Sequence, residues 1–127
     1  MTELNNIYKC EVCGNIVEVI HTGNGTLVCC DKPMILLKEH DKDEGFEKHL
    51  PVLSFEGDNM TVTIGEAMHP MEETHYIEWI EYIVDGNVRR VYLKPTDLPQ
   101  AVFQFIQKDS YIVRAYCNIH GLWEVRM

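Results

Sequence analysis

The sequence predicts an all-β protein of two units, a small metal-stabilised cysteine-rich hairpin followed by an immunoglobulin-like seven-stranded β-sandwich. Four of the five cysteines fall within the first thirty residues. Short β-type runs, separated by turn residues, fill most of the remaining chain. No stretch shows a sustained hydrophobic period of 3.6 residues, which argues against helices. We therefore expect a hairpin domain over residues 1–37, a linker over 38–45 and a sandwich over 46–127.

Composition limits the classes of partner. The 127 residues are 46% hydrophobic and 24% charged, as in folded globular proteins. The formal net charge of −9 opposes binding to phosphate backbones, so we expect no nucleic-acid partner. No apolar run approaches the ~20 residues of a membrane-spanning helix, and the first residues lack the basic-then-apolar pattern of a secretory signal. We therefore expect a cytoplasmic protein with no membrane partner.

The cysteine-rich block is expected to form one hairpin. Residues 16–20 and 26–29 favour strands, and Gly23-Asn24-Gly25 favours a turn between them. A module of fewer than about 40 residues buries too little apolar surface to fold alone and usually needs a metal or disulfides. The polar, charged stretch 38–45 then reads as a linker.

Seven β-type runs follow the linker, at the spacing of about 8–12 residues typical of a sandwich of immunoglobulin size. Asp85-Gly86-Asn87 predicts a hairpin turn between two of them. The runs cover residues 52–55, 60–64, 76–84, 88–93, 101–106, 111–116 and 122–125.

Four cysteines of the first block can form a metal site. Cys10 and Cys13 have the C-x2-C spacing that lets two sulfurs chelate one ion, and Cys29 and Cys30 add two more thiolates. Adjacent side chains on a strand point to opposite faces, so Cys29 and Cys30 can share an ion only if the backbone is distorted. The spacing does not distinguish iron from zinc. A disulfide framework is the other reading, and the odd cysteine count makes it awkward.

Four histidines and the remaining cysteine predict a second metal site. Each of them alone is typical of an ordinary loop histidine or a buried thiol. All five, however, lie at strand ends or in connections, and a sandwich gathers its loops at two ends. Imidazole with one thiolate suits iron, copper or zinc. His21 and His40 fall in the hairpin and the linker and are not expected to be ligands. The five candidates are His49, His69, His75, Cys117 and His120.

The chain contains, in this order, the runs Glu47–Val52, His69–His75 and Tyr116–Gly121. These three motifs resemble those of desulfoferrodoxin, the two-iron class of superoxide reductase. The block from Tyr8 to Cys30 resembles the desulforedoxin-like domain of the same proteins, so the similarity extends over nearly the whole chain. The resemblance implies two irons per chain. One would be bound by Cys10, Cys13, Cys29 and Cys30, and the catalytic iron by His49, His69, His75 and His120 in a plane, with axial Cys117 and an open sixth position.

The resemblance also implies an activity and partners. The chain would reduce superoxide to hydrogen peroxide without producing oxygen, take electrons from a rubredoxin-type donor, and form a homodimer. Lys48 would lie beside the open position and assist proton delivery, and Glu47 would ligate the oxidised iron. The residues support part of this independently, because an acidic chain repels superoxide unless a cation such as Lys48 lies close to the iron. Ala115 departs from the family pattern, which often has Glu there.

Two other functions fit some of the same residues. Cys117-x2-His120 with Met127 loosely resembles the ligand loop of a cupredoxin, a copper electron carrier, but this leaves the cysteine block and two histidines without a role. A zinc-stabilised interaction module leaves the placement of His49, His69 and His75 unexplained. Metal content separates the three: two irons, one copper, or zinc only.

Overall fold

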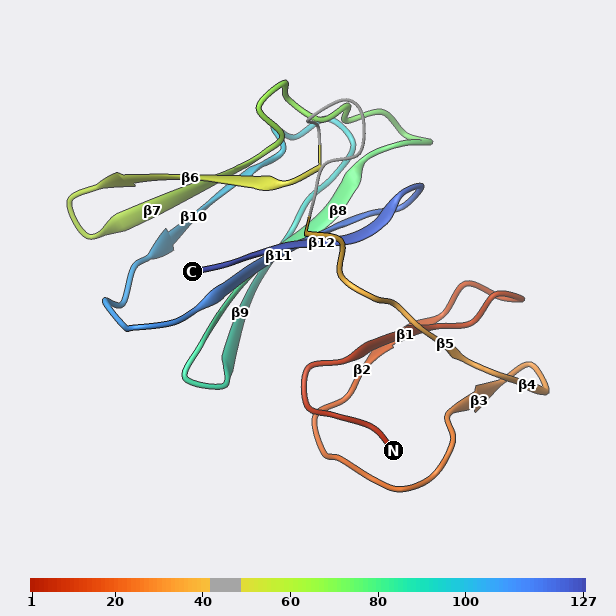
Figure 1. Ribbon diagram of the computed structural model, residues 1–127. Coiled ribbons are helices and arrows are strands. Elements are labelled where there is room, and N and C mark those ends of the chain that lie inside the picture. Colours follow the sequence, from red (N-terminus) through yellow and green to blue (C-terminus); the bar gives the residue numbers. More distant parts are fainter. Residues whose placement is uncertain (42–48) are drawn as a thin grey trace. The chain divides into compact units, whose positions relative to one another are not determined.

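The computed structural model describes residues 1–41 and 49–127, and the chain divides into two compact units, Met1–Lys38 and Glu39–Met127 (Figure 1). Every regular element of the described residues is a β-strand. None of these described segments forms a helix of the length and apolar character that a membrane crossing requires. The end of the expected linker and two expected site residues, Glu47 and Lys48, lie outside the described residues.

The first unit contains two small antiparallel sheets. In one sheet β1 (Ile7–Lys9) lies between β2 (Ile16–Glu18) and β5 (Ile35–Leu36). In the other, β3 (Val28–Cys29) pairs with β4 (Lys32–Pro33). The expected pairing of residues 16–20 with 26–29 is therefore wrong, although both segments contain strands.

The C-x2-C segment explains the different pairing. It forms a tight turn in which the Cys10 amide donates to the Asn15 carbonyl at 2.8 Å and the Gly14 amide donates to the Cys10 carbonyl at 3.0 Å. Gly14 has a φ of 86°, a conformation that glycine adopts without strain. This turn joins β1 directly to β2. The Gly23–Gly25 stretch belongs to a longer loop, held to the N-terminus where the Thr2 amide donates to the Gly23 carbonyl at 3.0 Å.

The second unit is a sandwich of two antiparallel sheets, as predicted (Figure 1). Within residues 49–127, one sheet has the order β10-β7-β6 and the other the order β12-β11-β8-β9. The strands are β6 (Pro51–Glu56), β7 (Asn59–Ile64), β8 (Ile77–Val84), β9 (Asn87–Tyr92), β10 (Gln100–Gln104), β11 (Ile112–Cys117) and β12 (Gly121–Arg126).

The core lies between the two sheets and is built from alternate residues of the strands. Met60, Val62 and Ile64 of β7 face Ile80 and Tyr82 of β8, and all five are fully buried. Each such side chain contributes about 1.5–3 kcal/mol by leaving water. These strands therefore provide a rigid support for the loops at their ends.

A row of alternating charges crosses the outer face of the four-stranded sheet. The strand register aligns Glu124, Arg114, Glu81 and Arg90 on neighbouring strands. Glu81 is fully buried, and its carboxylate accepts from Arg90 at 2.7 Å, Arg114 at 3.3 Å and the Trp79 indole at 2.7 Å. These partners compensate for the loss of hydration that burial imposes on the charge.

Part of the expected linker extends this sheet. The His40 amide donates to the Leu122 carbonyl, the Glu124 amide donates to the His40 carbonyl, both at 2.9 Å, and His40 forms a parallel bridge with Trp123. The backbone at His40 thus lies along the edge of β12, the strand that follows the loop carrying two candidate ligands.

Candidate metal sites

The first unit brings its four cysteines together. The sulfurs of Cys10, Cys13, Cys29 and Cys30 all lie within 4.8 Å of one another, and no disulfide joins them. The Val12 and Cys13 amides each donate to the Cys10 sulfur at 3.4 Å. The Cys13 amide, with a smaller contribution from Val12, lowers the pKa of Cys10 to about 6. This sulfur is therefore prepared to bind a cation as a thiolate.

A tight turn allows the adjacent residues Cys29 and Cys30 to direct their sulfurs to the same place. Cys29 is the last residue of β3, whereas Cys30 and Asp31 form a two-residue turn with φ values of 53° and 60°. Positive φ at both central residues is the signature of a type I′ hairpin. The predicted backbone distortion is therefore present, and it takes the form of a common turn that lets both sulfurs face one ion.

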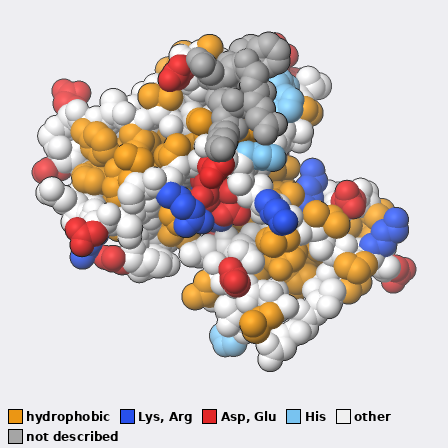
Figure 2. Space-filling model, in the orientation of Figure 1, with side chains coloured by type: hydrophobic (Ala, Val, Ile, Leu, Met, Phe, Trp, Pro, Cys, Tyr) orange, Lys and Arg blue, Asp and Glu red, His pale blue; other side chains and the backbone are white. Residues whose placement is uncertain are grey.

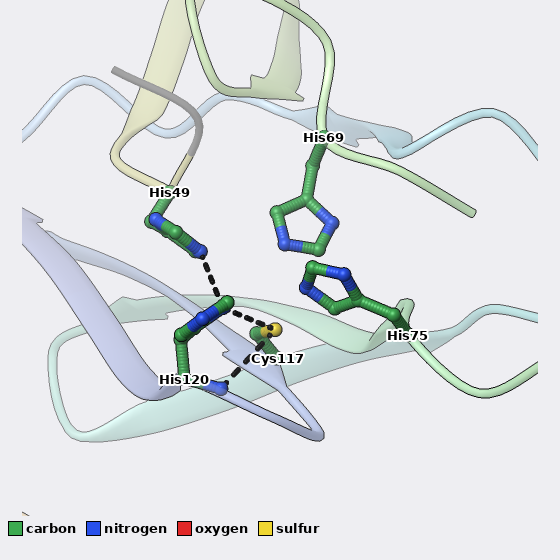
Figure 3. A group of neighbouring side chains, drawn as sticks. All are labelled: His49, His69, His75, Cys117 and His120. Carbon is green, nitrogen blue, oxygen red and sulfur yellow. Dashed lines mark hydrogen bonds between the residues drawn. The ribbon is translucent and has the colours of Figure 1, made fainter. Parts of the chain in front are cut away.

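The second unit brings the other five candidates together at one end of the sandwich (Figure 3). His49 lies two residues before β6, the connection between β7 and β8 carries His69 and His75, and Cys117 ends β11. His120 lies in the turn before β12 and is exposed, and Figure 2 shows histidine side chains at the molecular surface. One ligand atom from each of the five lies within 4.8 Å of all the others.

The four imidazoles form a closed ring. In the order His49, His69, His75, His120 and back to His49, the centroids are 5.0, 4.8, 5.0 and 4.7 Å apart. Neighbouring ring planes are inclined by 65° to 82°, so each imidazole meets the next edge to face. Figure 3 shows the rings around a common centre, with the Cys117 sulfur directed toward it. This arrangement fits four equatorial donors and one axial donor.

His69 has the hydrogen bonding of a metal ligand. Its Nδ1 lies 2.7 Å from the Pro70 carbonyl oxygen, which can only accept, so Nδ1 carries the proton. Its Nε2 is buried without a hydrogen-bond partner among the described residues. Burial lowers the pKa of His69 to about 4, which keeps the ring neutral. A carbonyl on one nitrogen and an open lone pair on the other is the usual state of a ligating histidine.

Cys117 is placed by an irregularity in the sheet. Tyr116 pairs with Trp79, but Cys117 pairs with Ile77, so β8 carries a bulge at this point. Bulges commonly redirect side chains beside functional sites. Burial raises the pKa of the Cys117 thiol, and amide hydrogen bonds from His120 and Ile119 oppose this only in part. This thiol is therefore harder to ionise than a free cysteine, and a bound cation would favour its thiolate form.

Trp123 contacts two of the candidate ligands, a role that sequence reasoning missed. Its indole stacks on His49, and its Nε1 donates to the His120 carbonyl at 3.1 Å. The His40 ring also packs against this indole, at a centroid distance of 4.6 Å. Ala115, the departure from the family pattern, is fully buried directly across from Trp123 in the β11–β12 pairing. The available signal was an aromatic residue three positions after a predicted ligand.

Two family models cover the chain almost completely. Residues 2–37 match the desulfoferrodoxin N-terminal domain, and residues 41–126 match desulfoferrodoxin itself. The chain belongs to the desulfoferrodoxin family. It is 57% identical over 124 residues to a desulfoferrodoxin homolog of Archaeoglobus fulgidus, with 98% of each chain covered.

Two more distant similarities are to proteins named superoxide reductase. A superoxide reductase of Pyrococcus abyssi is 41% identical over 96 residues, which cover 61% of this chain and 84% of that protein. The fold resembles the crystal structure of the superoxide reductase from Treponema pallidum, with a TM-score of 0.73 and 21% identity over 94% of this chain and 95% of that one.

The donor sets fit what desulfoferrodoxin domains bind. Four thiolates in the first unit and four imidazoles with one thiolate in the second are consistent with two irons per chain. Family membership removes the cupredoxin alternative.

Proposed function

We propose that this chain is a superoxide reductase, in which superoxide takes up one electron and two protons and leaves as hydrogen peroxide, without release of oxygen. The observation that carries the proposal is the ring of four imidazoles with one buried cysteine sulfur. Bound ferrous iron would supply the electron, and the five side chains that would hold it would leave one further position for the substrate. The superoxide reductase of Pyrococcus abyssi, 41% identical, supports this assignment.

The donor set sets the charge at the site. Four neutral imidazoles and one thiolate would give a ferrous site a net charge of +1, which would attract an anion. His69 supports this count, since its pKa of about 4 keeps it uncharged at neutral pH. As a thiolate, Cys117 would also raise the electron density on a bound metal, which would favour donation of an electron.

Lys48 and Glu47 are assigned roles in the proposed reaction because they directly precede the candidate ligand His49 in the sequence. The chain as a whole repels superoxide because its net charge is −9. Lys48 immediately precedes His49 and is proposed to supply local positive charge within the screening length of about 10 Å, and to assist proton delivery. Glu47 is proposed to ligate the oxidised iron. A rubredoxin-type electron donor, a homodimer and a cytoplasmic location are proposed with the same function.

Product stoichiometry tests the reaction. Anaerobically purified protein with its iron reduced is mixed with a known, substoichiometric amount of superoxide, and hydrogen peroxide and oxygen are measured. A reductase yields one peroxide per superoxide and no oxygen, whereas a dismutase yields half a peroxide and half an oxygen. Metal analysis accompanies the assay. One peroxide per superoxide with two irons per chain supports the proposal, and evolved oxygen, or zinc as the sole metal, overturns it.

A further inference from the structure

Asn118 holds the backbone on both sides of His75. Its side-chain Oδ1 accepts a hydrogen bond from the Tyr76 amide at 3.0 Å, and its Nδ2 donates to the Thr74 carbonyl at 3.1 Å. Its own amide donates to the Tyr76 carbonyl at 3.2 Å. Three hydrogen bonds from one residue therefore bracket a candidate ligand that lies more than forty positions away in the sequence.

These bonds join two ligand-bearing segments. Asn118 immediately follows Cys117, at the point where the β11–β8 ladder ends after its bulge. At this point the Asn118 amide still donates to the Tyr76 carbonyl, and the Asn118 side chain adds two hydrogen bonds to the segment that leads into β8. The position of Cys117 is thus linked to that of His75 through the main chain and the side chain of a single residue.

The backbone of His75 also takes part in a local contact. The Glu72 and His75 backbones exchange hydrogen bonds at 2.9 and 3.1 Å, which close a tight turn. This turn fixes the conformation of the segment but does not join it to β11. Asn118 supplies that connection, and the carboxamide suits it because it offers one acceptor and one donor in a planar group.

We propose that Asn118 is a positioning residue that sets the distance between two candidate metal donors, Cys117 and His75. The inference concerns the same metal site as the proposed function, and it rests on that function only to this extent. Aspartate at this position would still accept from the Tyr76 amide but would place a carboxylate oxygen against the Thr74 carbonyl. Alanine would remove both side-chain bonds.

Cobalt binding tests the proposal without superoxide. Full-length metal-free protein is titrated with Co²⁺, and the absorption bands of the two sites are followed separately. Asn118→Ala is expected to weaken Co²⁺ binding at the sandwich site by about 10–100-fold, the effect typical of groups that orient metal ligands. Asn118→Asp is expected to lie between alanine and the parent protein. The thiolate-to-cobalt band of the sandwich site should shift in both variants.

Two internal references accompany the titration. The four-cysteine site of the same chain should keep its affinity in every variant. Asn59→Ala changes an exposed asparagine beside the β6–β7 turn, at the end of the strands away from His49, and should leave both sites unchanged.

The outcomes separate positioning from stability. Unchanged cobalt affinity and spectrum in Asn118→Ala or Asn118→Asp, with only a lower unfolding midpoint, overturns the proposal. If the alanine variant does not fold, the aspartate variant decides it. A parent protein that binds cobalt normally but does not reduce superoxide refutes the proposed function and leaves this inference to be judged by the titration alone.

Discussion

The indole of Trp123 lies face to face with the imidazole of His49, with ring centroids 4.5 Å apart and planes inclined by 15°. The same indole donates to the His120 carbonyl, so one buried side chain of β12 contacts two ligands that are 71 positions apart in sequence. Aromatic contact of this kind fixes a ring plane as well as a ring position. Trp123 therefore restrains the orientation of His49 from the sandwich side of the site.

Substituting Trp123 should separate stacking from hydrogen bonding. Trp123→Phe keeps an aromatic face but loses the Nε1 donor, and we expect a loss of about 1–2 kcal/mol in stability with little change at the site. Trp123→Leu also loses the stack, so Co²⁺ affinity at the sandwich site should fall by about 10-fold. Urea unfolding and cobalt titration measure the two effects. His40→Ala, which alters the indole's other imidazole contact, is the control; equal affinities for the Phe and Leu variants would contradict the stacking role.

The buried carboxylate of Glu81 should dominate the stability of the four-stranded sheet. Glu81→Ala leaves the buried Arg114 without its counter-ion, and we expect a loss of about 3–5 kcal/mol. Arg90→Ala should cost less, because the Arg90 side chain is 20% exposed. The exposed Lys108–Asp85 pair provides the reference, and Lys108→Ala should cost less than about 1 kcal/mol. Urea unfolding at neutral pH gives all three values, and a Glu81 variant no weaker than the Lys108 variant would refute this ranking.

Local charge at Lys48 should govern the encounter with superoxide. Lys48→Ile is expected to lower the second-order rate constant by about 10-fold at low ionic strength, and the difference should shrink as salt is added. Lys108→Ile makes the same change in net charge beside Asp85, at the far end of β8, and should leave the rate nearly unchanged. Pulse radiolysis measures both constants. Equal rates for the two variants at low salt would rule out local steering.

Metal binding at the second site should depend on pH through Cys117. Because burial raises the pKa of this thiol, the metal-free protein holds a proton there at neutral pH, and a bound ion must displace it. Raising the pH removes this competition, so the apparent Co²⁺ affinity should increase by about tenfold per pH unit between about pH 7 and 8.5. His69 adds no slope in this range, because its pKa is about 4. A flat profile at the sandwich site, or an equal slope in Cys117→Ser, would exclude Cys117 as the source.

Periodicity predicted the sandwich well because its strands are long enough to show alternation and are bounded by turn residues. The first unit was harder, since its strands have only two or three residues. There the C-x2-C-Gly turn determined that β1 pairs with β2. The geometry of this turn depends on backbone conformation, which the pattern of hydrophobic residues does not reveal. The Gly23-Asn24-Gly25 turn was predicted from local sequence alone, and the strands on either side of it are too short to hold a hairpin together.

The ligands could be found from sequence because metal-binding residue types are few and were concentrated at strand ends. The groups that hold the ligands could not be found in the same way. Asn118 and Trp123 act through contacts with residues far along the chain, and neither type indicates a metal site by itself. Glu81 lies in an apolar strand, and only the register with β9 and β11 reveals its two arginine partners.

The two donor sets differ in how far they reach along the chain. The four cysteines of the first site lie between positions 10 and 30, whereas the candidate ligands of the second site lie between positions 49 and 120. Closing the short cysteine loop costs little entropy, so it can capture an ion while the rest of the chain is still being synthesised. The longer set exists only after strands from both sheets have folded against each other. The complete set of five donors for the second site therefore forms only once the sandwich itself has folded.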